Sequence, residues 1–187
     1  MAKSALDFTF AAPGQWKLIG SQTAANSATI DFTGLSNAYN SYCIVVSNII
    51  PVTNGVSLFM RTSTNNGTSY DVGASDYNYR LAGAVDNSVG ANSGTNAAQI
   101  KLTGLSSYVL GNGTAQALFG TIGLYNIGSA NRAYIQGSLS CYNSSNLQER
   151  DWCDGFRNSA TAVNAVRLIM SSGNISSGTF TLYGLEA

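Results

Sequence analysis

The sequence predicts an all-β protein, a single antiparallel β-sandwich of the jelly-roll type with about ten or eleven short strands. Apolar and polar residues alternate with a period of two in several short runs. In the run RAYIQGSLSCY, one face carries Ala133, Ile135, Leu139 and Cys141. Glycine and asparagine clusters, which favour turns, separate the runs. A length of 187 residues suits one domain with one core.

The alternating runs and the fully apolar runs predict the strands in chain order. Alternation indicates half-buried strands at residues 27–32, 56–62, 132–142 and 178–185, and another strand begins at residues 77–81. Runs that are apolar on both faces indicate central strands, or strands covered by another subunit, at residues 42–50, 115–127 and 164–170. Residues 83–96, which lack apolar core positions, predict a mobile loop. We expect residues 1–25 to form an N-terminal arm or first strand and residues 26–187 to form the sandwich.

Charge is scarce in this chain. Charged residues make up 10% of the sequence, against roughly 25% in ordinary domains, and the formal net charge is zero. This balance argues against nucleic acid or a membrane surface as a partner, and no apolar run of about 18 residues is present. Arginine outnumbers lysine, as it does at protein interfaces. We therefore expect self-association into a homo-oligomer, with a trimer as the favoured state.

Catalytic motifs are largely missing. The chain has no histidine, which removes the commonest general base and metal ligand, and it has neither a P-loop nor a dinucleotide fingerprint. We expect no enzymatic activity and no cofactor. A paired-carboxylate glycosidase is the catalytic alternative, with Trp152 available to stack on a sugar. Its candidate acids, in LQERDWCDGF, are Glu149, Asp151 and Asp154. The competing interpretation is a solvated loop in which Arg150 and Arg157 neutralise these acids.

The polar stretch RTSTNNGTSYDVGASDYNY, residues 61–79, holds most of the candidate interface or ligand residues. Tyrosine and arginine mark protein interfaces, and aromatic rings also stack on sugars. The candidates are Tyr70, Asp71, Asp76, Tyr77 and Tyr79, together with Arg150 and Trp152. Tyr70, Tyr77 and Tyr79 are predicted to be exposed, whereas Tyr125, Tyr134 and Tyr183 are predicted to pack inside strands. Asp71 and Asp76 are weak calcium candidates, and the alternative is that both acids cap turns.

The three cysteines divide into two kinds. Cys43 lies in an apolar run and is predicted to be a small core residue. Cys141 and Cys153 bracket a short connection, so they could form a disulfide. The alternative is that both stay reduced, as thiols do in a cytosol.

Three segments resemble a widespread family of small structural proteins encoded by tailed bacteriophages. The segments are YCIVVSNIIPVTNGVSLFMRTSTNNGTSYDVGASDY, AQALFGTIGLYNI and NAVRLIMSSGNISSGTFTLYGLEA. The last, with its Ser-Gly-Asn turn and terminal Thr-Leu-Tyr-Gly-Leu, is the most specific. The resemblance implies a β-sandwich on the outside of the particle, and it brings no catalytic or ligand signature with it.

The resemblance implies a non-enzymatic structural protein of the virion, assembled in the host bacterial cytoplasm. Its partners would be copies of itself and neighbouring virion proteins. Between two roles we prefer capsid decoration, in which the domain cements the shell. The alternative is a tail-fibre or tail-tip adsorption protein that contacts host surface carbohydrate. A free carbohydrate-binding module and a polysaccharide hydrolase are further hypotheses of other classes.

Overall fold

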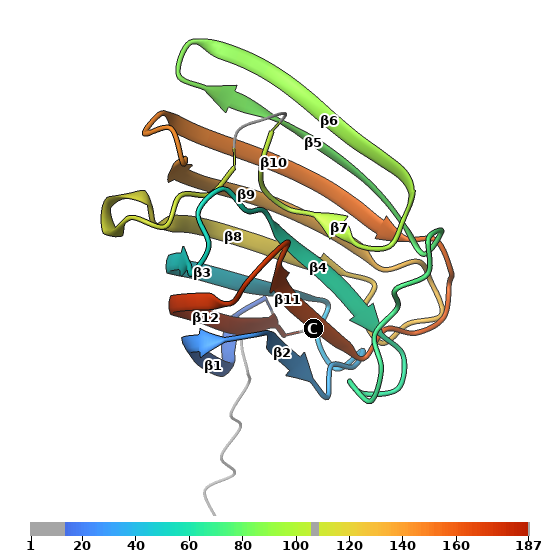
Figure 1. Ribbon diagram of the computed structural model, residues 1–187. Coiled ribbons are helices and arrows are strands. Elements are labelled where there is room, and N and C mark those ends of the chain that lie inside the picture. The colour runs from blue at the N-terminus through green and yellow to red at the C-terminus, as the bar shows by residue number, and fades with distance from the viewer. Residues whose placement is uncertain (1–13, 106–108, 187) are drawn as a thin grey trace, which may run out of the picture.

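The computed structural model describes residues 14–105 and 109–186, which form two antiparallel sheets packed face to face (Figure 1). This arrangement confirms the predicted antiparallel β-sandwich. Twelve strands are present in the described ranges, slightly more than expected. Within the same ranges, no helix is both long enough and apolar enough to cross a membrane.

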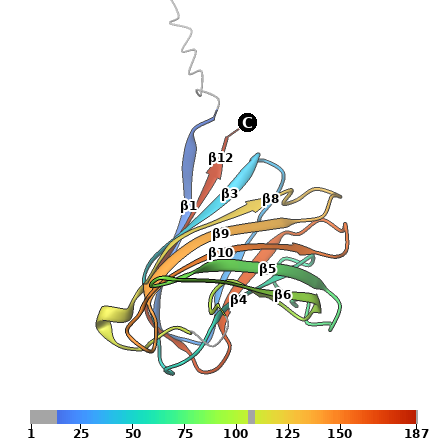
Figure 2. The same cartoon turned by 90° about the horizontal axis from the view of Figure 1, so that it is seen from above.

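The larger sheet contains eight strands. Their spatial order is β1 (Trp16–Ser27), β12 (Ile175–Leu185), β3 (Ser41–Pro51), β8 (Leu118–Tyr125), β9 (Tyr134–Tyr142), β10 (Gln148–Arg157), β5 (Tyr77–Val85) and β6 (Ser88–Ala97). Seen from above, these strands fan out, as expected of a strongly twisted sheet (Figure 2). The sheet therefore offers one broad face to the core and an equally broad face to the outside.

The smaller sheet contains four strands and lies in front of the larger one in Figure 1. Its order is β2 (Ile30–Thr33), β11 (Ala165–Met170), β4 (Leu58–Ser63) and β7 (Ile100–Lys101). A single 3-10 turn at Thr114–Gln116 precedes β8. The core lies between the sheets and includes Ile44, Leu58 and Phe180, all with no exposed surface. Hydrophobic burial between the two inner faces is the main stabilising contribution to this fold.

Two sequence predictions about strands are wrong. Residues 83–96 are not a loop, because they form most of the β5–β6 hairpin, which turns at Asp86 in the left-handed region (φ 47°). The hairpin was missed because β6 lies at a sheet edge and carries almost no apolar side chains. Residues 148–157 are not a solvated loop but β10, in which Glu149, Asp151 and Cys153 point inward.

The N-terminal prediction falls partly inside the described residues. Strand β1 runs from Trp16 to Ser27 and pairs with β12, so residues from Trp16 onward are a strand of the sheet. The predicted boundary between residues 25 and 26 falls inside this strand. The remainder of the predicted arm, residues 1–13, lies outside the described residues.

The three cysteines are free thiols. The register of β9 and β10 places Cys153 opposite Gly137 and Cys141 opposite Glu149, so the two cysteines are separated along the strands. Both thiols are buried, and the pairing of the two strands rules out the disulfide that their sequence positions allowed. Cys43 is half-buried on the outer side of β3, where the sequence predicted a core residue.

Truncating Phe180 tests the packing between the two sheets. Phe180→Ala should lower the free energy of unfolding by about 3–5 kcal/mol, because it removes a fully buried ring and leaves a cavity. Phe119→Ala is the matched control, since the Phe119 ring is 46% exposed on the outside of β8, and it should change stability far less. Urea denaturation followed by circular dichroism measures both. Equal losses in the two variants would contradict the described core.

Candidate functional site

The outer face of the eight-stranded sheet, meaning the face turned away from the smaller sheet, is the most distinctive surface of the molecule. In β8, β9 and β10, buried and exposed residues alternate. The exposed set is unusually rich in aromatic side chains. Its largest members are Phe119, Tyr125, Tyr134, Tyr142 and Trp152, joined by Trp16 and Leu18 of β1. Scattered apolar residues are normal on a protein surface, but a gathering of rings on one face marks a site.

Strand register arranges these side chains in rows that cross the strands. In the first row, Trp16 of β1 lies opposite Leu185, Leu185 opposite Ser41, and Ser41 opposite Tyr125. The row continues from Tyr125 to Tyr134 and then to Phe156 of β10. The Tyr134 and Phe156 ring centroids are 5.4 Å apart. We call Trp16, Tyr125, Tyr134 and Phe156 the aromatic row.

The next row is small and polar. Cys43 lies opposite Gly123, Gly123 opposite Gln136, and Gln136 opposite Asp154, which in turn lies opposite Arg80 of β5. We call these five residues the polar row. The third row contains Trp152, with Thr121 and Ser138 on one side of it and Ala82 on the other. The polar row thus lies between the aromatic row on one side and the row of Trp152 on the other.

These rows form a trough of about 600 Å³ on the outer face. Its outward-pointing lining is Trp16, Ser41, Cys43, Thr121, Gly123, Tyr125, Gln136, Ser138, Trp152, Asp154 and Leu185. A second hollow of about 270 Å³ shares Asp154 and continues the trough to Arg80 and Ser93. The trough therefore extends across the strands from β1 to β6.

Glycine at position 123 is needed for this shape. A Cβ atom at Gly123 would lie 2.7 Å from Tyr125 Oη, so the tyrosine ring leans over the glycine. Trp152 is held in a similar way, because the Arg150 guanidinium lies 5.2 Å from the centre of its ring and donates to Ser138 Oγ at 3.0 Å. Both rings therefore contact neighbouring groups of the same face.

The chemistry available in the trough is stacking and hydrogen bonding. Its polar groups are mainly hydroxyls and an amide, with Asp154 and Arg80 as adjacent opposite charges. Burial raises the pKa of the Cys43 thiol, so this thiol stays protonated and is a poor nucleophile. The described lining therefore offers no activated nucleophile with a partner base.

Of the residues predicted from sequence, Trp152 lines the trough, and Arg150 contacts Trp152 and Ser138 beside it. The structure also corrects the prediction for Tyr125 and Tyr134, which are not packing residues: their side chains are 42% and 48% exposed. The prediction missed Trp16, Gln136 and Phe156. The alternation of side chains along each strand was the available signal. Once the strand pairings are known, this alternation places these three residues on the same face as Trp152 and Tyr125.

The other predicted site residues have structural partners. Tyr77 was expected to be exposed but is fully buried, and its hydroxyl accepts from Thr62 N–H at 2.7 Å. Burial raises the pKa of Tyr77 to about 12. Asp71 Oδ2 accepts from Thr62 Oγ1 at 3.0 Å and pairs with Arg157 Nε at 2.7 Å. These contacts tie the loop after β4 to β4 and β10.

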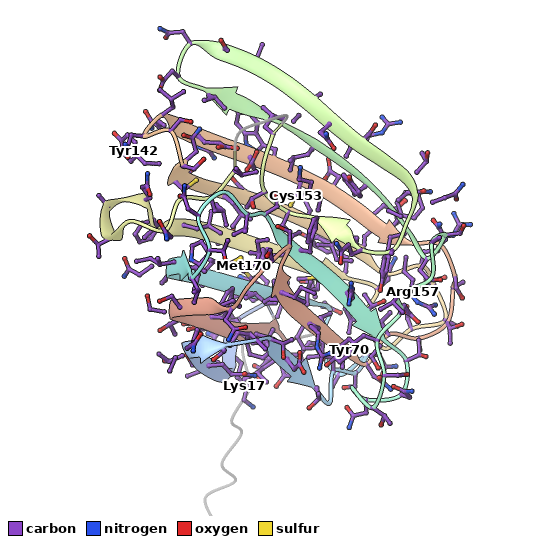
Figure 3. All side chains as sticks on the ribbon, viewed as in Figure 1. Lys17, Tyr70, Tyr142, Cys153, Arg157 and Met170 are labelled. Carbon is purple, nitrogen blue, oxygen red and sulfur yellow. The ribbon has the colours of Figure 1, made fainter. Side chains whose placement is uncertain are left out.

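Asp76, Tyr70 and Tyr79 also brace the fold. Asp76 Oδ2 accepts from the Gly73 N–H at 2.6 Å, as in a capped turn. The Tyr70 ring lies 4.0 Å from the Arg167 guanidinium, and Figure 3 places Tyr70 near Arg157, at one end of the molecule. The Tyr79 ring packs over Gly94 in β6. Asp71 and Asp76, the weak calcium candidates, therefore each accept hydrogen bonds from donors of the protein itself.

A buried carboxyl pair lies behind the trough, on the core side of β10. Glu149 and Asp151 are 1% and 2% exposed. Asp151 Oδ2 accepts from Gly104 N–H at 3.0 Å, and Glu149 Oε1 accepts from Leu105 N–H at 3.2 Å. Burial and the charge of Glu149 raise the pKa of Asp151 to about 7. Among the described residues, Glu149 Oε2 and Asp151 Oδ1 have no hydrogen-bond partner, and the raised pKa of Asp151 favours its protonated form in this buried position.

The glycosidase hypothesis needs two of its candidate acids, Glu149, Asp151 and Asp154, to face one cleft. The structure separates them, since Asp154 lies in the trough and the other two acids lie in the core.

Comparisons of this chain with protein-family models, with curated proteins and with solved structures give no match, so the resemblance to phage structural proteins stays a prediction.

The raised pKa of Asp151 predicts that the protein loses stability as the pH rises. Because the pKa of Asp151 is raised from 3.8 to about 7 on folding, the folded state holds a proton that the unfolded state releases between these values. The free energy of unfolding should therefore be higher at pH 5 than at pH 8. No histidine titrates in this window. Urea denaturation at both pH values measures the difference.

Two variants assign this pH dependence to the pair. Glu149→Gln should reduce it, because the substitution removes the neighbouring charge and supplies an amide N–H donor, while burial of Asp151 remains. Asp154→Asn, which changes an exposed acid of the same strand, should retain it. Equal stability of the wild type at the two pH values would contradict the raised pKa of Asp151.

Proposed function

We propose that this chain is a non-enzymatic adsorption protein on the exterior of a tailed-phage particle, and that it binds surface carbohydrate of the host through the trough. The observation that carries the proposal is the trough itself, in which Trp16, Tyr125 and Trp152 surround hydroxyl and amide groups. The virion location is supported by the sequence resemblance, above all by the C-terminal segment.

A sugar chain suits the trough for chemical reasons. The C–H face of a sugar ring stacks on an aromatic ring, while its hydroxyls need donors and acceptors at the side. The trough supplies rings in the aromatic row and hydrogen-bonding groups at Gln136 and Asp154. Its volume of about 600 Å³ falls within the roughly 300–1,000 Å³ usual for ligand sites. Its course across the strands, continued by the second hollow, suits a chain of several sugars.

The carboxylates support binding without hydrolysis. Glycoside hydrolysis generally needs two carboxyl groups on either side of the scissile bond. Among the described lining residues of the trough, Asp154 is the one carboxylate, and Arg80 lies opposite it. Glu149 and Asp151 are separated from the trough by the sheet itself.

Capsid decoration is a second candidate, and the structure of β6 favours it. This strand forms an uncharged sheet edge of a kind that pairs with other proteins. A decoration protein would use that edge in a lattice on the shell. A cryo-EM map of the virion separates the candidates, because adsorption proteins occupy the tail and decoration proteins occupy the capsid.

Ring truncation tests carbohydrate binding. Trp152→Ala and Tyr125→Ala should each weaken binding to a responsive glycan on a bacterial surface-glycan array by about tenfold, because each removes a stacking surface. Tyr142→Ala is the matched control, since Tyr142 is equally exposed on the same face but lies outside the trough, at the far end of the sheet from Arg157 (Figure 3). Binding should also change the intrinsic fluorescence, because both tryptophans of the chain line the trough.

The control variant decides how the array is interpreted. An equal loss of glycan binding in the Tyr142 and Trp152 variants would assign the binding to non-specific adsorption on the exposed aromatic surface. If no glycan binds the wild type, or binding survives both trough variants, the proposal is wrong.

A further inference from the structure

Each sheet of the sandwich ends in two edge strands, and three of these four edges carry features that discourage pairing. An edge strand exposes unpaired N–H and C=O groups, which charge, bulges or shortness protect from association. Strand β1 carries Lys17 and a register shift between Leu18 and Gly20. Strand β2 has four residues and includes Asp31. Strand β7 has two residues and ends in Lys101.

The fourth edge, β6, has none of these features over most of its length. It contains ten residues, SVGANSGTNA, without a charge or a proline. From Ser88 to Gly94 it pairs with β5 without a register shift, and the shift comes only beyond Gly94. Figure 1 shows β6 as the outermost strand along the top of the sheet, and no described residue pairs with its free side. The side chain of Val89 is 87% exposed.

We propose that β6 pairs with β6 of a second copy of this chain, antiparallel about a two-fold axis at Ala91. Centring the pairing on Ala91 uses the whole regular stretch from Ser88 to Gly94. It places Val89 opposite Ser93, and Gly90 opposite Asn92. All of these side chains are small and uncharged, so they can face their counterparts without steric or electrostatic conflict. The backbone supplies the hydrogen bonds, as in other strand-addition interfaces.

The charged residues nearest to β6 are compatible with this register. Arg80 lies on β5 opposite Ser93, one strand away from the new interface. Asp86 precedes β6 in the hairpin turn, and its Oδ1 accepts from Gln148 N–H at 3.0 Å. In the proposed register position 86 faces position 96, which is Asn96. No two like charges are therefore brought opposite each other.

The pairing would join two eight-stranded sheets into one continuous sheet. The second hollow of the trough reaches Ser93 on β6, so the troughs of both copies would approach the shared edge. Two weak sites on one rigid surface bind a repeating ligand more firmly than either site alone. The association itself does not depend on what occupies the trough, and it can be measured without a ligand.

Light scattering with a matched pair of variants tests the proposal. The wild type should have a molar mass about twice the chain mass of 19.5 kDa. Ala91→Lys should raise the dimer dissociation constant by about tenfold or more, because it places two lysines opposite each other at the axis. Ala82→Lys is the control: Ala82 is exposed on β5 directly opposite Ala91, and its variant should remain dimeric. Circular dichroism checks that both variants are folded.

A cross-linking readout fixes the register independently. In a Cys43→Ser background, Ala91→Cys should give a covalent dimer with a short thiol-reactive cross-linker, and Ala82→Cys should not. A monomeric wild type would overturn the proposal, as would the trimer predicted from sequence. A dimer that is unaffected by Ala91→Lys, or that fails to cross-link through position 91, would place the interface elsewhere and would also overturn it.

Discussion

The antiparallel register of the large sheet is the constraint on which the rest of the structure depends. From β8 through β9 and β10 to β5, the pairings run without a shift. Because side chains alternate between the faces of a strand, a slip of one residue in β10 would turn Trp152 into the core and Cys153 to the outside. The same register therefore decides both what is buried and which side chains line the trough. Register shifts occur instead in the pairings of β1, β3, β12 and the end of β6.

This register also explains why two acids lie in the core. With Trp152 outward, Glu149 and Asp151 must point inward, where an ionised carboxylate is costly unless it is paired or hydrogen-bonded. The N–H groups of Gly104 and Leu105 and the protonation of Asp151, whose pKa is raised, offset that cost. The hydrogen bond from Leu105 N–H to Glu149 also fixes Leu105 beside the β5–β6 hairpin. Its side chain lies close to Gly90 of β6, where an added Cβ would be 3.2 Å from Leu105 Cδ2. The pair thus connects the middle of the sheet to the strand at its edge.

Sequence periodicity predicted most strands and the fold class, because apolar alternation directly reflects burial on one face. It failed for β6 and β10, where tertiary contacts decide the structure. Strand β6 has no buried residue, so its sequence shows no apolar alternation. Strand β10 buries two carboxyl groups, which sequence analysis assigns to solvent. The trough was only partly predictable. Trp152 and Arg150 were identified, but Trp16 and Tyr125 are distant in sequence, and only the pairing through Leu185 and Ser41 brings them into one row.

The scarcity of charge gives binding and assembly a common physical basis. Several charges are engaged in ion pairs: Asp31 with Arg167, Asp71 with Arg157, and Lys17 with Glu186. In the polar row, the remaining charges are Asp154 and Arg80, which lie opposite each other, and β6 carries no charge. A neutral, hydroxyl-rich surface releases its water at a lower cost than a charged one, so it favours a neutral ligand in the trough and an uncharged strand at the edge. Both surfaces belong to one sheet: the trough lies on its outer face and β6 forms its edge, and the two meet where the second hollow reaches Ser93.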